Sequence, residues 1–451
     1  MKFTSILTIC VFCAFAAPAA AQATPLSLAQ AVGYALQHSP AIAKQTAVVS
    51  QMRSSYVKAR SQTLPGVVGQ VSNEMSKSAN YSGAYSVIGA SQASVFSQNT
   101  AQLGTSYTFN GGLNHYLSVA ARQQYEQAQS DLRRTQQQVT SNVSDAYFSL
   151  AAKKETVRLD EGDLRYQQAL VAVAKAKERA GVAAGVDVLS AQAAEEKSRY
   201  ALASAQADAA NAAESLAQII GAPLDTAFAV AEAVAQPALP SQPLDSLIAL
   251  AQAHRPDIAS AADALAIAQT DRREADTDLF PQIQTFANLG NQFSPTLAVE
   301  QAKFGPVTRG NLGFWNIGIN TSISLPFVDW GARRANHRNL DEQIAAAQSA
   351  LGAARAQAEI DVRQSYRAAQ TALAQLASAR DETTYASEAA RIAQLQYAHG
   401  LITLIDVQQR QQAALSAQVD LYNARVAYVN AIVKLRVALG VQTPEQVVAD
   451  I

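Results

Sequence analysis

The sequence has almost no cysteine, little proline and few charged side chains. Its 2 cysteines, Cys10 and Cys13, both lie in an apolar stretch near the start, so disulfides, zinc thiolates and cysteine nucleophiles are excluded from the rest of the 451 residues. The 35 basic and 36 acidic residues give a formal net charge of -1, which provides no positive field to hold a nucleic acid. A nucleic-acid partner is therefore not expected.

The common catalytic and metal-binding signatures are also missing. We find no GxSxG, no HExxH and no phosphate-binding glycine loop, and no two histidines have metal-ligand spacing on one predicted helix. The sequence therefore predicts a protein that is not an enzyme, with no catalytic residues, no cofactor and no metal site. A secreted hydrolase is the weakest of the functional alternatives for this reason.

The first 23 residues have the pattern of a secretory signal peptide. Lys2 precedes an apolar stretch, and the small residues around Ala21 and Ala23 offer two cleavage positions. No later run approaches the ~20 apolar residues that a membrane-spanning helix requires. We therefore expect the mature chain to leave the cytoplasm, and to enter a membrane, if it does so, through strands.

The chain consists of two homologous halves. The repeated positions are His38, Pro40, Gly181 and Asp187, which recur as His254, Pro256, Gly400 and Asp406. The first two pairs are 216 residues apart and the other two are 219 residues apart. We therefore expect a first repeat at 24–221, a proline-containing strap at 222–244, a second repeat at 245–440 and a tail at 441–451.

Each half is predicted to contain a helix, two strands, a long helix and a half-length helix. The first helices cover 27–62 and 245–278, the long helices 113–180 and 332–399, and the half-length helices 187–220 and 406–439. A 68-residue helix would be about 100 Å long, far longer than in an ordinary globular domain. Apolar residues spaced seven apart are Val143, Leu150, Val157, Leu164 and Val171. That spacing is typical of a coiled coil.

The four predicted strands cover about 66–80, 95–109, 282–294 and 311–327. In the last one, apolar residues from Trp315 onward alternate with small or polar residues, which predicts a sheet with one apolar face. Such a face suits either a soluble core or membrane lipid. In a membrane, four strands cannot close a barrel, since the smallest barrels have about eight strands. The membrane interpretation therefore requires several chains to share one barrel.

This pattern resembles the TolC family of outer-membrane efflux and secretion channels over nearly the whole mature chain. The segments that carry the resemblance are His38-Ser39-Pro40, His254-Arg255-Pro256, Leu64-Pro65, Phe280-Pro281, Phe109-Asn110-Gly111-Gly112 and Phe327-Val328-Asp329-Trp330-Gly331. The resemblance implies a coiled-coil α-helical barrel joined to a transmembrane β-barrel. It further implies a homotrimer whose chains contribute four strands each to a shared 12-stranded barrel.

The resemblance also implies a function and partners. The chain would be a channel-tunnel in the outer membrane of a Gram-negative bacterium, extending into the periplasm and serving as the exit duct of a tripartite efflux pump or type I secretion system. Its partners would be a periplasmic adaptor (membrane fusion) protein, an inner-membrane pump and outer-membrane lipid. The alternative is a periplasmic coiled-coil structural or surface adhesion protein without a pore.

Three sets of site residues follow from the resemblance. The periplasmic gate would comprise Asp187, Asp406, Tyr397 and Gln409. The hairpin tips that contact the adaptor would comprise Gly181, Val182, Gly185, Gly400, Leu401 and Ile402. The aromatic residues at the membrane interface would be Tyr107, Phe109, Trp315, Phe327 and Trp330.

Simpler roles remain open for the gate and tip residues. Asp187 and Asp406 open predicted helices, where a carboxylate caps the amide groups whether or not it lines a pore. Apolar residues at the tips can pack the turn against its neighbour instead of meeting a partner. Gln409 and Ile402 depart from the family pattern, because some relatives carry an aspartate and an arginine at these positions.

Overall fold

The computed structural model describes residues 25–79, 93–181, 184–226, 228–230, 236–294, 310–323 and 328–440. The expected signal peptide and the expected tail lie outside these residues. The chain divides into two compact units. One comprises Gln45–Leu132 and Pro256–Ala356, and the other comprises Met1–Lys44, Arg133–Arg255 and Gln357–Ile451. None of the described helices is both long enough and apolar enough to cross a membrane.

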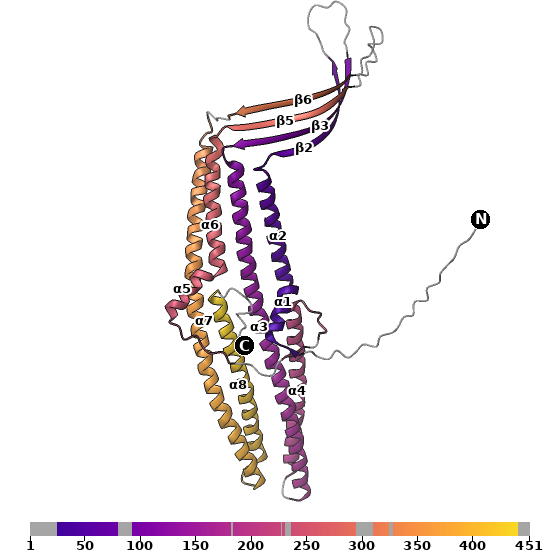
Figure 1. Cartoon of the computed structure of the whole chain (residues 1–451). Helices are drawn as coiled ribbons and strands as arrows, with labels where there is room; N and C mark the ends of the chain where they lie inside the picture. The colour runs from indigo at the N-terminus through magenta and orange to yellow at the C-terminus, as the bar shows by residue number, and fades with distance from the viewer. Residues whose placement is uncertain are drawn as a thin grey trace, which may run out of the picture. The chain divides into compact units, whose positions relative to one another are not determined.

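A four-stranded antiparallel sheet dominates the first of these units (Figure 1). Its strands are β2 (Gly66–Ala79), β3 (Ala93–Asn110), β5 (Gln282–Ser294) and β6 (Gly310–Ser322). They pair in the order β2-β3-β5-β6, so each repeat supplies one hairpin and the two hairpins meet at β3 and β5. Among the described residues, β2 and β6 each have a neighbour on one side only.

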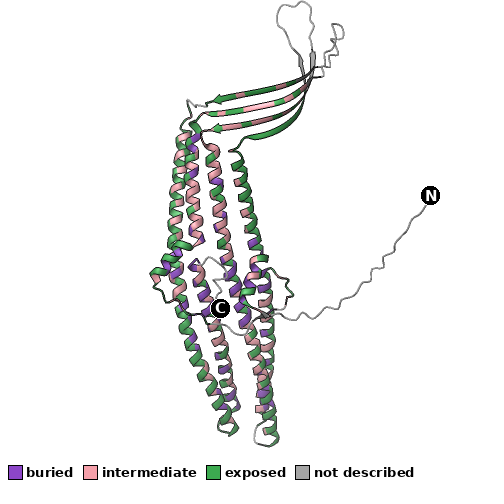
Figure 2. Ribbon diagram, viewed as in Figure 1, coloured by how far each residue is buried: buried purple, intermediate pink, exposed green. Residues whose placement is uncertain are grey.

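The register of the sheet places apolar side chains on one face. Leu103 is paired with Leu289 and Leu289 with Trp315, so the three side chains lie on the same face. The next position on β6 along that face is Ile317, and Trp315 and Ile317 are about three-quarters exposed, at 76% and 75%. Figure 2 shows that the strands are exposed or half-exposed wherever they are coloured. The predicted apolar face is therefore present, and none of the described residues of the chain covers it.

The opposite face of the sheet is mainly polar. Gln102 donates a hydrogen bond across the strands to Gln70 at 2.8 Å. The ring of Phe286 lies so close to Gly318 that a Cβ added there would be 2.5 Å from a ring carbon. Glycine is therefore required opposite this aromatic residue, and the ring covers backbone that would otherwise be bare.

The last strand is shorter than predicted from the sequence. We expected a strand over 311–327, but β6 ends at Ser322, and 324–327 lie outside the described residues. Ser322 pairs with Gln282, the first residue of β5, and Pro281 precedes it. Because proline has no N–H to donate, the ladder cannot continue past this pair.

Long helices extend from the ends of the sheet hairpins. In this unit they are α2 (Pro40–Ser61), α6 (Pro256–Ala275) followed by the short 3-10 helix η1 (Asp276–Leu279), and the first turns of α3 (Leu113–Arg179) and α7 (Ala332–Ala398). Two cross-repeat hydrogen bonds join α6 to α3. The hydroxyl of Thr270 donates to Gln123 at 2.9 Å, and that of Ser260 donates to Asp131 at 2.8 Å.

The other unit is helical. It contains α1 (Leu28–His38), α4 (Gly185–Ile220), α5 (Leu244–His254), α8 (Leu404–Ala438) and the remainder of α3 and α7. The buried residues of α8 follow two series with a seven-residue spacing, namely Ala417, Ala424, Ala431 and Ala438, and Val407, Ala414, Tyr428 and Leu435, where the second series skips the half-buried Leu421. Such spacing keeps one seam facing a partner helix. The small alanine side chains allow α7 and α8 to pack closely along it.

The predicted first helix of each repeat is broken in two. We expected continuous helices over 27–62 and 245–278, but Ser39 and Arg255 have extended backbones and separate α1 from α2 and α5 from α6. A proline follows each of these residues and disfavours the helical conformation before it. The break at Arg255 packs against Gly440 just beyond α8, where an added Cβ would lie 2.8 Å from the Arg255 nitrogen.

The segment between the repeats is non-helical where it is described. Strand β4 (Ala229–Val230) pairs in parallel with β1 (Pro25–Leu26). Further on, the Tyr428 hydroxyl of α8 donates to the carbonyl oxygen of Pro237 at 2.7 Å. Hydrogen bonds therefore attach the strap to β1 and to α8, and α5 begins at the end of the strap.

Candidate gate at the helical hairpin tips

Two helical hairpins, α3–α4 and α7–α8, carry the predicted tip residues. Gly181 and Gly400 have φ angles of 72° and 77°, so each long helix ends at a glycine in the left-handed conformation. Leu401 is 73% exposed and Ile402 is half-buried. Val182 lies outside the described residues. Gly185 is the first residue of α4, directly after the turn.

The two tips are capped differently. In the second hairpin, the backbone N–H of Thr403 donates to Asp406 Oδ2 at 3.0 Å, and the N–H of Asp406 donates to Thr403 Oγ1 at 3.3 Å. This reciprocal pair is a capping box. In the first hairpin the equivalent of Thr403 is Ala184, which has no side-chain oxygen, and α4 begins without a side-chain cap. Asp187 lies in the first turn of α4, as predicted, but only the second hairpin has a side-chain capping hydrogen bond among the described residues, and Asp406 forms part of it.

The hydrogen bonds of the capping box also fix the charge of Asp406. Its carboxylate accepts from the hydroxyl of Thr403 at 2.6 Å and from the backbone N–H of the same residue. These two bonds hold the pKa of Asp406 below its usual range, and Arg410 adds a smaller effect in the same direction. Asp406 is exposed. It therefore presents a permanent negative charge at the tip at neutral pH.

The two hairpins pack against each other just beyond their tips. Leu404, the first residue of α8, is 2% exposed and lies in a cluster with Leu170 and Ala174 of α3 and Val188 and Ala191 of α4. Tyr166 and Tyr397 cover its margin. An apolar contact therefore joins the end of one hairpin to the other.

A cation also joins the hairpins at this level. The Nζ atom of Lys177, on α3, lies 3.7 Å from the centroid of the Tyr397 ring on α7 and donates to the Tyr397 carbonyl oxygen at 3.2 Å. Burial raises the pKa of the Tyr397 hydroxyl, and the charge of Asp187 raises it further. Lys177, Tyr397 and Asp187 therefore form one electrostatic group across the two hairpins.

Comparison with known proteins identifies the family. The outer membrane efflux protein family matches residues 31–222 and 247–441, which is most of both repeats. The chain belongs to this family. The predicted TolC-type relationship is confirmed, and the chain is an outer-membrane channel protein that serves as an exit duct and extends into the periplasm. The alternative of a spacer or adhesin without a pore is set aside.

Individual relatives and solved structures agree with the family assignment. The toluene efflux pump outer membrane protein TtgC of Pseudomonas putida is 27% identical over 360 residues, which cover 77% of this chain and 70% of the relative. Protein CyaE of Bordetella pertussis is 26% identical over 356 residues, covering 77% and 71%. The compared relatives are channel proteins and not enzymes.

The fold recurs in solved channel structures. The Campylobacter jejuni CmeC outer membrane channel aligns with a TM-score of 0.76 at 20% identity, covering 92% of this chain and 85% of that one. The structure of CusC aligns with a TM-score of 0.75 at 20% identity, covering 92% of each. The predicted fold class, a duplicated helical repeat joined to a four-stranded sheet, is thereby confirmed for this efflux family member.

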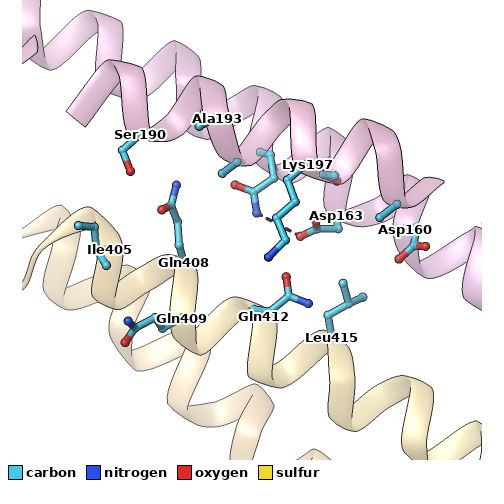
Figure 3. Close-up of a pocket in the computed structure, with 14 residues that line it drawn as sticks. Asp160, Asp163, Ser190, Ala193, Lys197, Ile405, Gln408, Gln409, Gln412 and Leu415 are labelled. Carbon is cyan, nitrogen blue, oxygen red and sulfur yellow. Dashed lines mark hydrogen bonds between the residues drawn. The ribbon is translucent and has the colours of Figure 1, made fainter. Parts of the chain in front are cut away.

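A polar pocket lies between the hairpins of this efflux protein (Figure 3). It has a volume of about 560 Å³ and is lined by residues of α3, α4 and α8. The predicted gate residue Gln409 is exposed and lies on its wall, together with Gln408 and Gln412 of the same helix. Asp163 and Gln167 lie on the opposite side, on α3. The gate prediction did not identify this pocket, because its residues come from three separate helices.

The tips contain apolar residues that the prediction missed. Val186 and Leu189 in the first turns of α4 are each 67% exposed, and Ile405 at the start of α8 is 54% exposed. Each lies within five residues of a predicted tip residue. The sequence contains a signal for these residues, because each is an apolar residue near the start of a helix whose other positions there are polar.

The predicted interface aromatics occupy different parts of the strands and the segments that follow them. Tyr107 and Phe109 are close to the end of β3, while Trp315 is on the apolar face of β6. Trp330 follows β6 and is 94% exposed, with a φ angle of 50° that is unusual for a residue with a side chain. Phe327 lies outside the described residues. Whether these side chains meet the membrane interface stays a prediction.

Proposed function

We propose that three copies of this efflux channel close one twelve-stranded barrel in the outer membrane and one helical tunnel beside it. The observation that carries the proposal is the sheet: β2 and β6 are edge strands among the described residues, and the Trp315 face is exposed. In hydrocarbon, each unpaired backbone group would cost several kcal/mol. Pairing of β6 in one chain with β2 in the next removes both edges, and lipid covers the apolar face.

The proposed tunnel ends at the hairpin tips. Asp406, Asp187, Tyr397 and Gln409 would form its periplasmic gate. In this proposal, the three Asp406 carboxylates form an acidic ring that attracts cations and repels anions. The capping box supports the proposal because it holds each carboxylate ionised and in a fixed position. Capping and gating are therefore compatible roles for the same residue.

The proposed partners are a periplasmic adaptor and an inner-membrane pump. The curated relatives include outer-membrane proteins of efflux pumps, one of them named for toluene efflux. The exposed apolar side chains of Leu401 and Ile405, with Val186 and Leu189 on the other tip, provide a surface for the adaptor. The channel itself supplies no energy, so transport would depend on the pump.

Two measurements test the proposal. Purified protein should be trimeric by mass in detergent and should produce single-channel currents in planar bilayers, whereas a stable monomer without currents would refute it. Asp406→Asn should reduce cation selectivity and blockade by multivalent cations. The matched control is Asp420→Asn, an exposed carboxylate further along α8. Equal selectivity of the two variants would leave Asp406 with capping alone.

A further inference from the structure

The polar pocket between the hairpins contains buried atoms without hydrogen-bond partners. Gln167 is 6% exposed and Ser198 is 5% exposed, and both line the pocket. Among the described residues, Gln167 Oε1, Ser198 Oγ and Gln408 Nε2 have no hydrogen-bond partner. A buried polar atom without a partner costs about 1 to 3 kcal/mol. The two oxygens among them, Gln167 Oε1 and Ser198 Oγ, therefore indicate that a ligand with hydrogen-bond donors occupies this end of the pocket.

The buried end of the pocket is rich in hydrogen-bond acceptors. Asp163 is 9% exposed, and its Oδ1 atom accepts from Gln167 Nε2 at 3.2 Å, which leaves its second oxygen available alongside Gln167 Oε1 and Ser198 Oγ. Asp160 adds another carboxylate at the margin. Burial raises the pKa of Asp160, and the charge of Asp163 raises it further.

The ligand chemistry follows from the charges and the walls. Two carboxylates and the single ammonium of Lys197 leave a formal charge of -1 among the lining residues. The described residues contain no group of three His, Cys, Asp or Glu side chains that could hold a metal ion. Ala194, Leu415 and other small or apolar side chains line the remaining wall, where an alkyl group would fit.

We propose that this pocket binds an organic cation consisting of a primary ammonium group on a short alkyl chain. The three N–H donors of the ammonium match Asp163, Gln167 Oε1 and Ser198 Oγ, and the alkyl chain packs on the apolar wall. Lys197 is exposed and lines the same pocket, so its charge opposes the ligand. Figure 3 shows Lys197 extending from α4 toward α8, near Gln412.

The site gives the channel a means of regulation beyond its function as a duct. The ligand contacts α3 and α4 of one hairpin and α8 of the other, so it binds best when the two hairpins are paired. A ligand that prefers one conformation shifts the population toward it. Bound ammonium therefore favours the paired arrangement of the hairpins at the tips.

Titration of the purified full-length channel with n-butylammonium at pH 7 tests the site, with n-butanol as the neutral comparator. Asp163→Asn should weaken butylammonium binding by about 10- to 100-fold, the effect of losing a hydrogen bond to a charged group. Glu161→Gln, an exposed neighbour on α3 outside the pocket, is the matched control and should leave binding unchanged. Lys197→Met should strengthen binding.

Three outcomes would overturn the proposal: equal binding of butanol and butylammonium, equal affinities of Asp163→Asn and Glu161→Gln, or weaker binding by Lys197→Met. Ser198→Ala is the second variant in case Asp163→Asn fails to fold, and it should weaken binding by about 3- to 10-fold. Because binding is measured without a membrane current, its failure would leave the proposed pore untouched. Loss of channel currents would likewise not bear on the site.

Discussion

The contact between Lys177 and Tyr397 should hold the two hairpins of one chain together in the closed channel. Lys177→Met keeps the apolar part of the side chain and removes the ammonium that lies 3.7 Å from the Tyr397 ring and bonds its carbonyl oxygen. A cation–π contact at a half-buried site contributes about 1 kcal/mol. The hydrogen bond contributes up to a further ~1 kcal/mol. The paired arrangement should therefore lose about 1 to 2 kcal/mol per chain.

In the proposed trimer this loss is multiplied. If three chains open together and each loses the contact, the closed state is destabilised by about 3 to 6 kcal/mol, because the three losses add. Each 1.4 kcal/mol changes an equilibrium tenfold, so the ratio of open to closed channels should rise at least about 100-fold. The measurement is open probability in planar bilayers. Lys177→Met should raise the open probability strongly. Tyr397→Leu, which removes the ring, should raise it less in the Lys177→Met background than in the wild type.

Lys175→Met is the control for this experiment. Lys175 is exposed on the same helix, two residues away, and removal of its charge changes the net charge of the tip equally. If the two lysine variants open to the same extent, general electrostatics explains the effect and the specific contact does not hold the hairpins. If neither opens, the hairpins are held by the apolar cluster around Leu404.

Three further predictions test the helix ends, the sheet and the cap. Gly440→Ala should lower the melting temperature, because the φ of 73° at Gly440 and the nearby Arg255 backbone both exclude a Cβ. Gly352→Ala has open space around it and should stabilise α7 by up to ~1 kcal/mol. Ile317→Arg on the apolar face should cost about 2 to 4 kcal/mol in lipid and prevent assembly, but Asn316→Arg on the opposite face should still yield trimers in membrane fractions. The pKa of Asp406 is lowered from 3.8 by folding, so its stabilising effect is complete above that value and is lost as the pH falls through the lowered pKa. Hydrogen-exchange protection at the start of α8, relative to the intrinsic exchange rate at each pH, should therefore decrease there in the wild type and not in Asp406→Asn.

The sequence predicts most element ends because local chemistry determines them. Gly181 and Gly400 end the long helices, since each adopts a φ that other residues avoid. The alternation from Trp315 onward predicts the face of β6 correctly, because side chains on a strand alternate whatever the partner. The breaks before Pro40 and Pro256 were also predictable from the restriction that proline places on the preceding residue.

Contacts between distant elements were beyond sequence reasoning. The gate prediction included Tyr397, but Lys177 is 220 residues away along the chain, and neither residue signals the other. The difference between the tips is an intermediate case. Thr403 three residues before Asp406 has the spacing of a capping box, and Ala184 before Asp187 lacks it. A comparison of the two repeats at these positions would have predicted that only one tip is capped.

The duplication also predicts which interface of the proposed trimer is weaker. In a ring of alternating hairpins, the contact within a chain places Lys177 of the first hairpin against Tyr397 of the second. The contact between chains would instead bring together the repeat equivalents of these two residues. With the shift of 219 residues, Gln396 is the equivalent of Lys177 and Glu178 is the equivalent of Tyr397. Both are exposed within one chain, and neither supplies a cation or a ring. Since a neutral amide and a carboxylate can form at most one hydrogen bond in water, worth about 1 kcal/mol or less, neighbouring chains should part at the tips before the hairpins of one chain do.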